Sequence, residues 1–164
     1  MFLLLFNSQF TLDVLRSNYE FYEPRCIHES SLSPSVHSIL ASQLGKKEEA
    51  FAFFKFATRM DLDNYNRNSG EGLHTTSIAA AWMNIVYGFG GLRADGDMLT
   101  LAPSIPEQWE GYRFHIVYLD EIICVEVRKG QTEIYTLHGG QIVLGIYGKI
   151  TMIDGKKQVF VMPG

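Results

Sequence analysis

The chain has 164 residues, of which 46% are apolar and 20% are charged. This length fits one domain or two small ones, with enough apolar side chains to form a core. The 14 basic and 18 acidic side chains give a formal net charge of −4. This balance argues against a nucleic-acid-binding protein, which needs a surplus of positive charge.

The N-terminal segment and the two cysteines suggest an intracellular protein. The apolar run 1–6 has no basic residue ahead of it and meets polar residues at once, so it is too short for a signal peptide and far shorter than the ~20 apolar residues of a membrane span. Cys26 and Cys124 are far apart in sequence and predict neither a disulfide framework nor a metal-binding motif. A single disulfide between them remains an alternative. We therefore expect a cytoplasmic protein without membrane contact.

The first half of the chain has a helical hydrophobic period. It predicts helices over 11–22, 33–44, 46–60 and 75–87. The last of these helices is apolar on nearly all sides, so we expect it to be enclosed by other elements. Because three further helices and a small sheet domain offer little to enclose it, we expect the helical half to be part of something larger.

The period changes to two after the glycine cluster at Gly88, Gly90 and Gly91. Alternating runs predict strands at 112–118, 123–127, 133–137, 142–147 and 156–162, with turn signals between most of them. The sequence therefore predicts an α+β protein whose second half is an antiparallel β-sandwich with a jelly-roll-like character.

Two loops place hydroxyl groups and a histidine directly before a predicted helix. They are 28–33, with the sequence HESSLS, and 72–77, with the sequence GLHTTS. Unpaired backbone amides and the helix dipole favour an anion at such a position. The structural alternative is that the hydroxyl groups only cap the helices, as Ser33 in the first loop and Thr75 or Thr76 in the second, and spacing alone favours this alternative.

A metal or cofactor is not expected. The polar loop 61–72 carries carboxylates, but it has no glycine at its sixth position and no glutamate at its twelfth, as a calcium-binding loop would. We interpret it as a solvated loop. A zinc site made of histidines is set aside because no pair among them has the spacing of a zinc motif; these are His28, His37, His74, His115 and His138.

Several segments, taken together and in order, carry a resemblance that is more specific than any one of them. They are YEPR (22–25), HESSLSPSVHSILASQLG (28–45), DLDNYN (61–66), EGLHTTSIAAAWMNIVYGFGGLR (71–93) and LAPSIPEQW (101–109). From about Phe10 to its end, the chain resembles glycoside hydrolase family 65, the family of maltose, kojibiose, nigerose and trehalose phosphorylases. Residues 1–9 do not resemble it, and whether they are native to the family or foreign to it stays open.

The resemblance implies an inverting phosphorolysis of an α-linked glucoside, which yields β-glucose 1-phosphate and a free sugar, in an (α/α)₆ barrel flanked by β domains. Residues 1–92 would be the last helices of this barrel, and residues 93–164 the C-terminal antiparallel β domain. Phosphate then takes the place of the attacking water, and one glutamic acid protonates the leaving oxygen. That glutamate belongs upstream of the matched segments, so no catalytic residue is assigned and we expect the chain alone to be inactive.

Matched to the family's motifs, the phosphate pocket falls on Ser30, Ser31 and His74, with Thr75 and Thr76 as weaker candidates. The implied partners are inorganic phosphate and, only together with the missing barrel, an α-linked glucose disaccharide whose identity the sequence does not reveal. Three alternatives stay open. One is a non-catalytic phosphate- or carbohydrate-binding or structural module, such as a homo-oligomer that hides its aromatic helix faces. The second is an α-glucoside hydrolase of the same family, and the third is a truncated product without function.

Overall fold

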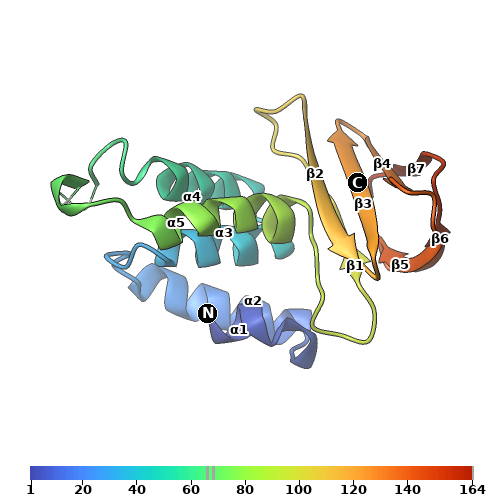
Figure 1. Ribbon diagram of the computed structural model, residues 1–164. Coiled ribbons are helices and arrows are strands. Elements are labelled where there is room, and N and C mark those ends of the chain that lie inside the picture. Colours follow the sequence, from blue (N-terminus) through green and yellow to red (C-terminus); the bar gives the residue numbers. More distant parts are fainter. Residues whose placement is uncertain (66, 68, 164) are drawn as a thin grey trace. The chain divides into compact units, whose positions relative to one another are not determined.

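The structure is a computed structural model that describes residues 1–65, 67 and 69–163. The chain forms two compact units, Met1–Phe89 and Gly90–Gly164. The first is helical and the second is built of strands (Figure 1), so the predicted α+β class is confirmed. Across the described part of the chain, no helix combines the length and the apolar character that crossing a membrane requires.

The helical unit follows the predicted periods closely. Its α-helices are α1 (Phe2–Leu5), α2 (Leu12–Tyr22), α3 (Ser33–Gln43), α4 (Lys47–Arg59) and α5 (Thr75–Met83), and π-helical turns continue α5 over Asn84–Phe89. The sequence predicts α2 to α5 within a few residues, whereas α1 is too short to show a period. Short 3₁₀ turns lie at Asn7–Gln9, Glu23–Arg25 and Ser69–Glu71.

Close antiparallel packing joins α3, α4 and α5 (Figure 1). Two buried serines join α4 to both neighbours: the hydroxyl of Ser38 on α3 donates to the carbonyl of Ala50 at 2.8 Å, and that of Ser77 on α5 donates to the carbonyl of Ala57 at 3.2 Å. Small side chains let helix backbones approach one another. Because α4 runs opposite to both neighbours, α3 and α5 begin at the same end of the unit.

Within this chain the last helix is only partly enclosed, in keeping with the small number of elements that could cover it. Ser77 and Ala80 of α5 are buried, but Ile78 is 55% and Trp82 is 52% exposed. α5 therefore buries one side within the unit and leaves apolar surface on the other. An apolar side of this kind is typical of a helix that packs against further elements.

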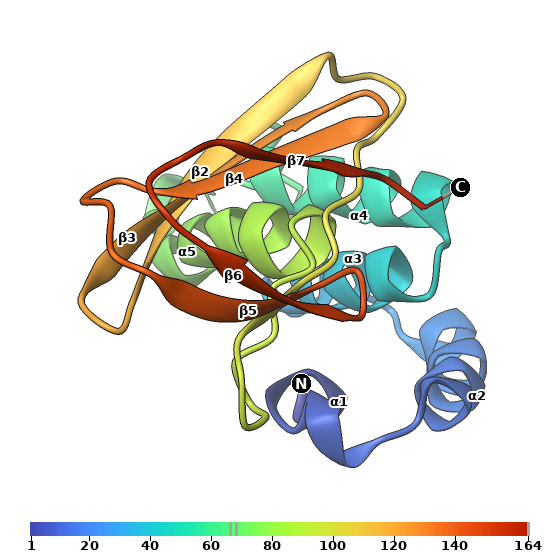
Figure 2. The ribbon, with the colours of Figure 1, turned by 90° about the vertical axis from the view of Figure 1, so that its right-hand side faces the viewer.

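The second unit contains two sheets (Figure 2). One has the order β2 (Gly111–Tyr118), β3 (Glu121–Arg128), β4 (Gln131–Thr136) and β7 (Gln158–Val161), with every pairing antiparallel. The other has the order β1 (Thr100–Leu101), β5 (Ile142–Ile146) and β6 (Lys149–Ile153). β5 and β6 are antiparallel, but β1 pairs with β5 in parallel, which departs from the purely antiparallel prediction.

The inward faces of the strands form one apolar core, and the predicted β-sandwich is confirmed. Alternate residues are buried along β2, as its period predicts. The core side chains are Phe114, Ile116, Ile123, Val125, Val127, Ile134, Leu144, Ile146 and Ile153. A polar tie links the sheets, since Thr132 lies 2.8 Å from the hydroxyl of Tyr147, which donates to the carbonyl of Pro103 at 2.9 Å.

Truncation of Ile134 tests this core. Its side chain is 0% exposed, so we expect Ile134→Ala to lower the free energy of unfolding by about 2–5 kcal/mol through lost burial and a cavity. Val117 on β2 is 76% exposed, and Val117→Ala should cost about 0.5 kcal/mol or less. Urea unfolding followed by circular dichroism measures both, and equal losses would contradict the assigned core.

Candidate functional site

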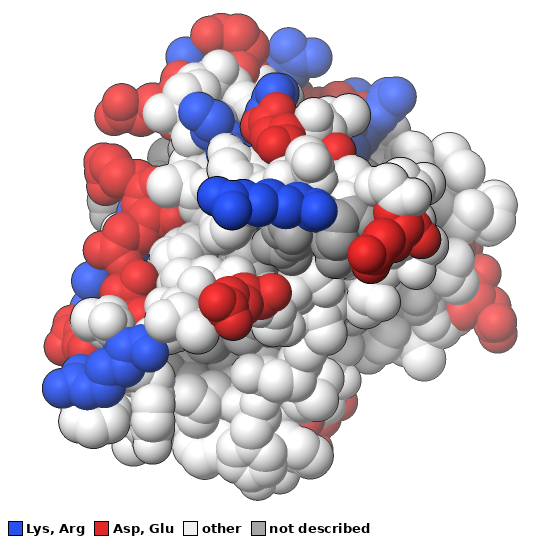
Figure 3. All heavy atoms as spheres, turned by 90° about the vertical axis from the view of Figure 1, so that its left-hand side faces the viewer, with Lys and Arg blue, Asp and Glu red and all other residues white. Residues whose placement is uncertain are grey.

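The two loops that precede α3 and α5 lie at the same end of the helical unit (Figure 1). Figure 3 faces the left-hand side of Figure 1, where this end lies, and shows mostly uncharged surface with basic and acidic side chains interspersed. A ligand here would therefore be held by particular side chains and not by a broad field of one sign.

The first loop is organised around the hydroxyl of Ser33. Its Oγ lies 2.9 Å from Nδ1 of His28, 3.3 Å from Nδ1 of His37 and 3.2 Å from Sγ of Cys26. The N-cap of α3 is Leu32, so the prediction that Ser33 caps this helix is wrong. The hydroxyl instead joins three groups that are not neighbours in the sequence.

The amides before α3 are largely bonded within the loop. The N–H of Leu32 donates to Oγ of Ser30 at 3.4 Å, and the N–H of Ser33 donates to the carbonyl of Ser30 at 3.0 Å. Pro34 has no N–H to offer. The expectation of unpaired amides at this helix start is therefore wrong for these residues. Ser30 is exposed and Ser31 is partly buried, and the accepting Oγ of Ser30 keeps its own hydrogen for another acceptor.

The second loop is held by a carboxylate from further back in the chain. Oδ2 of Asp61 accepts from the backbone N–H of His74 at 2.9 Å, and Oδ1 lies 2.5 Å from Nδ1 of the same residue. His74 is the N-cap of α5, so the predicted cap by Thr75 or Thr76 is wrong. Both threonines are exposed, and the N–H of Thr75 donates to the carbonyl of Leu73 at 2.9 Å.

Asp61 is the residue of this site that sequence reasoning misses. The prediction of a solvated loop is wrong for it, because its side chain is only 14% exposed. The hydrogen bond from the His74 side chain, followed by that from the His74 backbone, holds the pKa of Asp61 below its ordinary value. The signal in the sequence is the segment DLDNYN, which carries the family resemblance but gives no hint of its partner.

An apolar hollow lies beside the Asp61–His74 pair. It has a volume of about 340 Å³, and its lining includes Met60, Leu62, Leu73 and Ile78, with Asp61 at its edge. Leu62 and Leu73 are exposed. This lining suits apolar side chains and not an anion.

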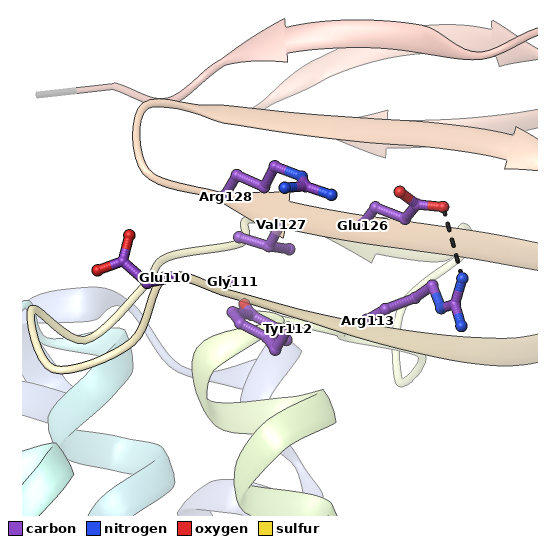
Figure 4. A pocket seen from close by; sticks show the side chains of 7 residues that line it. All are labelled: Glu110, Gly111, Tyr112, Arg113, Glu126, Val127 and Arg128. Atoms are coloured by element: carbon purple, nitrogen blue, oxygen red, sulfur yellow. Dashed lines mark ion pairs between the residues drawn. The ribbon is translucent and has the colours of Figure 1, made fainter.

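A groove of about 330 Å³ on the β unit carries charges that cancel (Figure 4). Arg113 on β2 and Glu126 on β3 are cross-strand partners whose charged groups lie 3.9 Å apart, and Figure 4 shows them directed toward each other. Glu126 also meets Lys157 at 3.3 Å. Glu110 and Arg128 complete the charged lining. None of the site residues predicted from the sequence lies in this groove.

Comparison with known proteins gives matches along most of the chain. Residues 1–83 match the "Glycosyl hydrolase family 65 central catalytic domain", and residues 92–151 match the "Glycosyl hydrolase family 65, C-terminal domain". The chain belongs to glycoside hydrolase family 65. The first match includes residues 1–9, so this segment also resembles the family, a point that the sequence alone left open.

Individual relatives are phosphorylases that are much longer than this chain. Maltose phosphorylase of Bacillus subtilis (strain 168) is 41% identical over 152 residues, which cover 93% of this chain and 20% of the relative. Alpha,alpha-trehalose phosphorylase of Geobacillus stearothermophilus is 43% identical over 136 residues, covering 83% and 18%. A solved structure described as a putative kojibiose phosphorylase from human microbiome has a TM-score of 0.93 and 45% identity, covering 99% of this chain and 24% of its own. The family 65 chain thus spans about a fifth of its curated relatives.

The two contacts of the Asp61 carboxylate with His74 predict that Asp61→Asn changes the stability of the fold in a pH-dependent way. An asparagine has no charge and replaces one acceptor oxygen by an NH2 donor, so it cannot accept both N–H groups of His74 as the carboxylate does, and we expect a lower melting temperature at neutral pH. Because the folded-state pKa of Asp61 lies below its ordinary value of 3.8, the carboxylate stabilises the fold above that value and loses this effect as the pH falls through the lowered one. The melting temperatures of wild type and variant should therefore converge as the pH falls below 3.8 and through the lowered pKa.

Thermal unfolding between acid and neutral pH measures the effect of the Asp61 substitution. Glu71→Gln is the matched control, because Glu71 is an exposed carboxylate in the same loop, and it should leave the neutral-pH melting temperature close to that of wild type. A pH-independent difference between wild type and Asp61→Asn would contradict the assigned role of the carboxylate.

Proposed function

We propose that this chain is the C-terminal part of an inverting disaccharide phosphorylase. In this proposal residues 1–92 are the last helices of an (α/α)₆ barrel, residues 93–164 are the C-terminal β domain, and the substrates are inorganic phosphate and an α-linked glucose disaccharide. Support comes from the relatives, which are named as maltose, trehalose and kojibiose phosphorylases. It also comes from the matches to a central catalytic and a C-terminal domain of family 65.

The exposed apolar surface of the helical unit supports its place in a larger helical layer. Besides Ile78 and Trp82 on α5, exposed apolar side chains include Phe21 on α2 and Leu62 and Leu73 around the apolar hollow. Surfaces of this kind are unfavourable in water and favour a partner. In a member of family 65, we propose that further barrel helices cover this surface.

The phosphate is proposed to bind at the shared end of α3 and α5, to the side chains of Ser30, Ser31 and His74, with Thr75 and Thr76 at the margin. This proposal rests on the two contacts that the Asp61 carboxylate makes with His74, the N-cap residue of α5. With Nδ1 held by Asp61, the imidazole has a fixed orientation and keeps Nε2 for a ligand. Ser30 offers a hydroxyl hydrogen, so the site has donors without relying on unpaired amides.

In the proposed reaction a phosphate oxygen attacks the anomeric carbon of the glucosyl unit while the α-glucosidic bond breaks. The leaving oxygen takes a proton from a glutamic acid that the matched segments do not include. The residues of this chain would bind the phosphate and orient one of its oxygens. Orientation of a nucleophile raises the rate only when the acid and the sugar are also in place, so the 164-residue chain by itself is proposed to be inactive.

Phosphate binding is testable on the chain alone. At a concentration about 100 times the dissociation constant, a ligand of the folded state adds about 2.7 kcal/mol of stability, and we expect inorganic phosphate to raise the melting temperature by several degrees. His74→Ala should abolish this rise. His138→Ala, at an exposed position of the β unit, should retain it. Potassium chloride at equal ionic strength separates binding from a salt effect, and an unchanged melting temperature in phosphate would contradict the site.

Catalysis is testable with the same material. We expect no glucose 1-phosphate when the chain is incubated with phosphate and maltose, trehalose, kojibiose or nigerose, because loss of a general acid alone costs about 10²–10⁴-fold in rate. Full-length maltose phosphorylase of Bacillus subtilis is the positive control with maltose. Turnover by the 164-residue chain would show that it contains its own acid and would refute this part of the proposal.

A further inference from the structure

Three metal-ligating side chains come together in the loop before α3. Cys26 follows the 3₁₀ turn Glu23–Arg25, His28 lies in the loop, and His37 lies in the second turn of α3. Each offers one ligand atom, and the three atoms lie within 4.8 Å of one another. All three residues are partly buried. A thiol and two imidazoles at such separations form a donor set of the kind that binds zinc.

We propose that Cys26, His28 and His37 bind a thiophilic divalent cation of the zinc class. The cation would have three protein ligands and a fourth position for water or another small ligand. This site is distinct from the proposed phosphate site, whose side chains are Ser30, Ser31 and His74, and it does not depend on the proposed phosphorylase function.

The separations fit the dimensions of a tetrahedral site after a small adjustment. Bonds of ~2.3 Å to sulfur and ~2.0–2.1 Å to nitrogen place ligand atoms about 3.3–3.6 Å apart. The three ligand atoms lie within 4.8 Å of one another, so binding would require side-chain rotations that bring them closer by up to about 1.5 Å. Cysteine binds as the thiolate, so metal binding would release its proton.

The surroundings of His37 support ligation. Metal-bound histidines donate their second ring N–H to a carbonyl or a carboxylate, which fixes the tautomer. Nδ1 of His37 lies 2.8 Å from the carbonyl oxygen of Ser33, so this ring has such an acceptor and can keep the lone pair of Nε2 for a cation. Nε2 of His28 lies 3.9 Å from a carboxylate oxygen of Glu23, which is too long for a direct hydrogen bond.

The backbone of His28 provides a further sign of constraint. Its φ is +52°, in the left-handed region that residues other than glycine seldom adopt. This conformation brings the imidazole to the thiol and to His37, with ring centroids of the two histidines 4.7 Å apart. The competing explanation is that the hydroxyl of Ser33, within 3.3 Å of all three groups, holds them without a metal.

Cobalt(II) titration of the reduced full chain separates these explanations. Cobalt bound to a thiolate absorbs by charge transfer, so we expect an absorption band that saturates at one cobalt per chain and disappears when zinc is added. Cys26→Ser should abolish the band, and His37→Ala should weaken cobalt affinity at least tenfold. Cys124→Ser, at the other cysteine, which lies in the core of the β unit, should leave the band unchanged.

Ser33→Ala provides the decisive comparison, because it removes the hydroxyl and none of the three ligands. Retained cobalt affinity in this variant supports the metal site. Absence of a band in the wild-type chain, or a band that persists in Cys26→Ser, overturns the proposal. Zinc should also raise the melting temperature of the wild-type chain, and an unchanged value in zinc overturns it even if Cys26→Ser fails to fold. Phosphate protection measured with a chelator present tests the proposed function separately.

Discussion

The packing of α4 against both α3 and α5 is the constraint on which the rest of the helical unit depends. The hydroxyls of Ser38 and Ser77 are buried, and a buried hydroxyl without a partner is costly. Each finds its acceptor on a carbonyl of α4, at Ala50 and Ala57. These bonds form only when the helices are close and in one register. The register in turn brings the loops before α3 and α5 to the same end.

The two loops use different means to hold a histidine. In the first, the hydroxyl of Ser33 lies among Cys26, His28 and His37. In the second, Asp61 binds both the backbone and the ring of His74. In both loops, backbone N–H groups that could bind an anion at the start of a helix are already bonded within the protein. The chemistry of this end therefore depends on side chains whose positions are fixed by packing, with little help from the helix dipole or the net charge of −4.

The fold could be predicted where one face of an element is buried, because burial imposes a period on the sequence. This holds for α2 to α5 and for β2, in which Phe114 and Ile116 alternate with exposed residues. β6 was missed because the turn before it is Tyr147-Gly148, both at positive φ, and a tyrosine is not a usual signal for such a turn. The pairing of β1 with β5 joins residues 45 positions apart, such as Thr100 and Gly145, and no local pattern encodes it.

The site was less predictable, because its hydrogen bonds are not the ones that cap spacing indicates. Ser33 has the right identity for a helix cap, yet its hydroxyl lies next to His37, one turn further along the same helix. The pair of Asp61 and His74 is 13 residues apart and depends on how the loop between them folds back on α5. The spacing of the histidines gives no sign that Cys26 lies with His28 and His37 in one cluster.

Asp61 places a negative charge close to the proposed phosphate site. A carboxylate next to a phosphate is unfavourable by itself, because like charges repel strongly where water is partly excluded. Nδ1 of His74 contacts the Asp61 carboxylate. A phosphate bound at Nε2 would therefore be separated from Asp61 by the imidazole ring. Donation from Nε2 as well as Nδ1 requires the doubly protonated ring, which carries one positive charge between two anionic groups. Asp61 then acts as a counter-ion that fixes the direction of the remaining N–H, and its negative charge is compatible with an anion site.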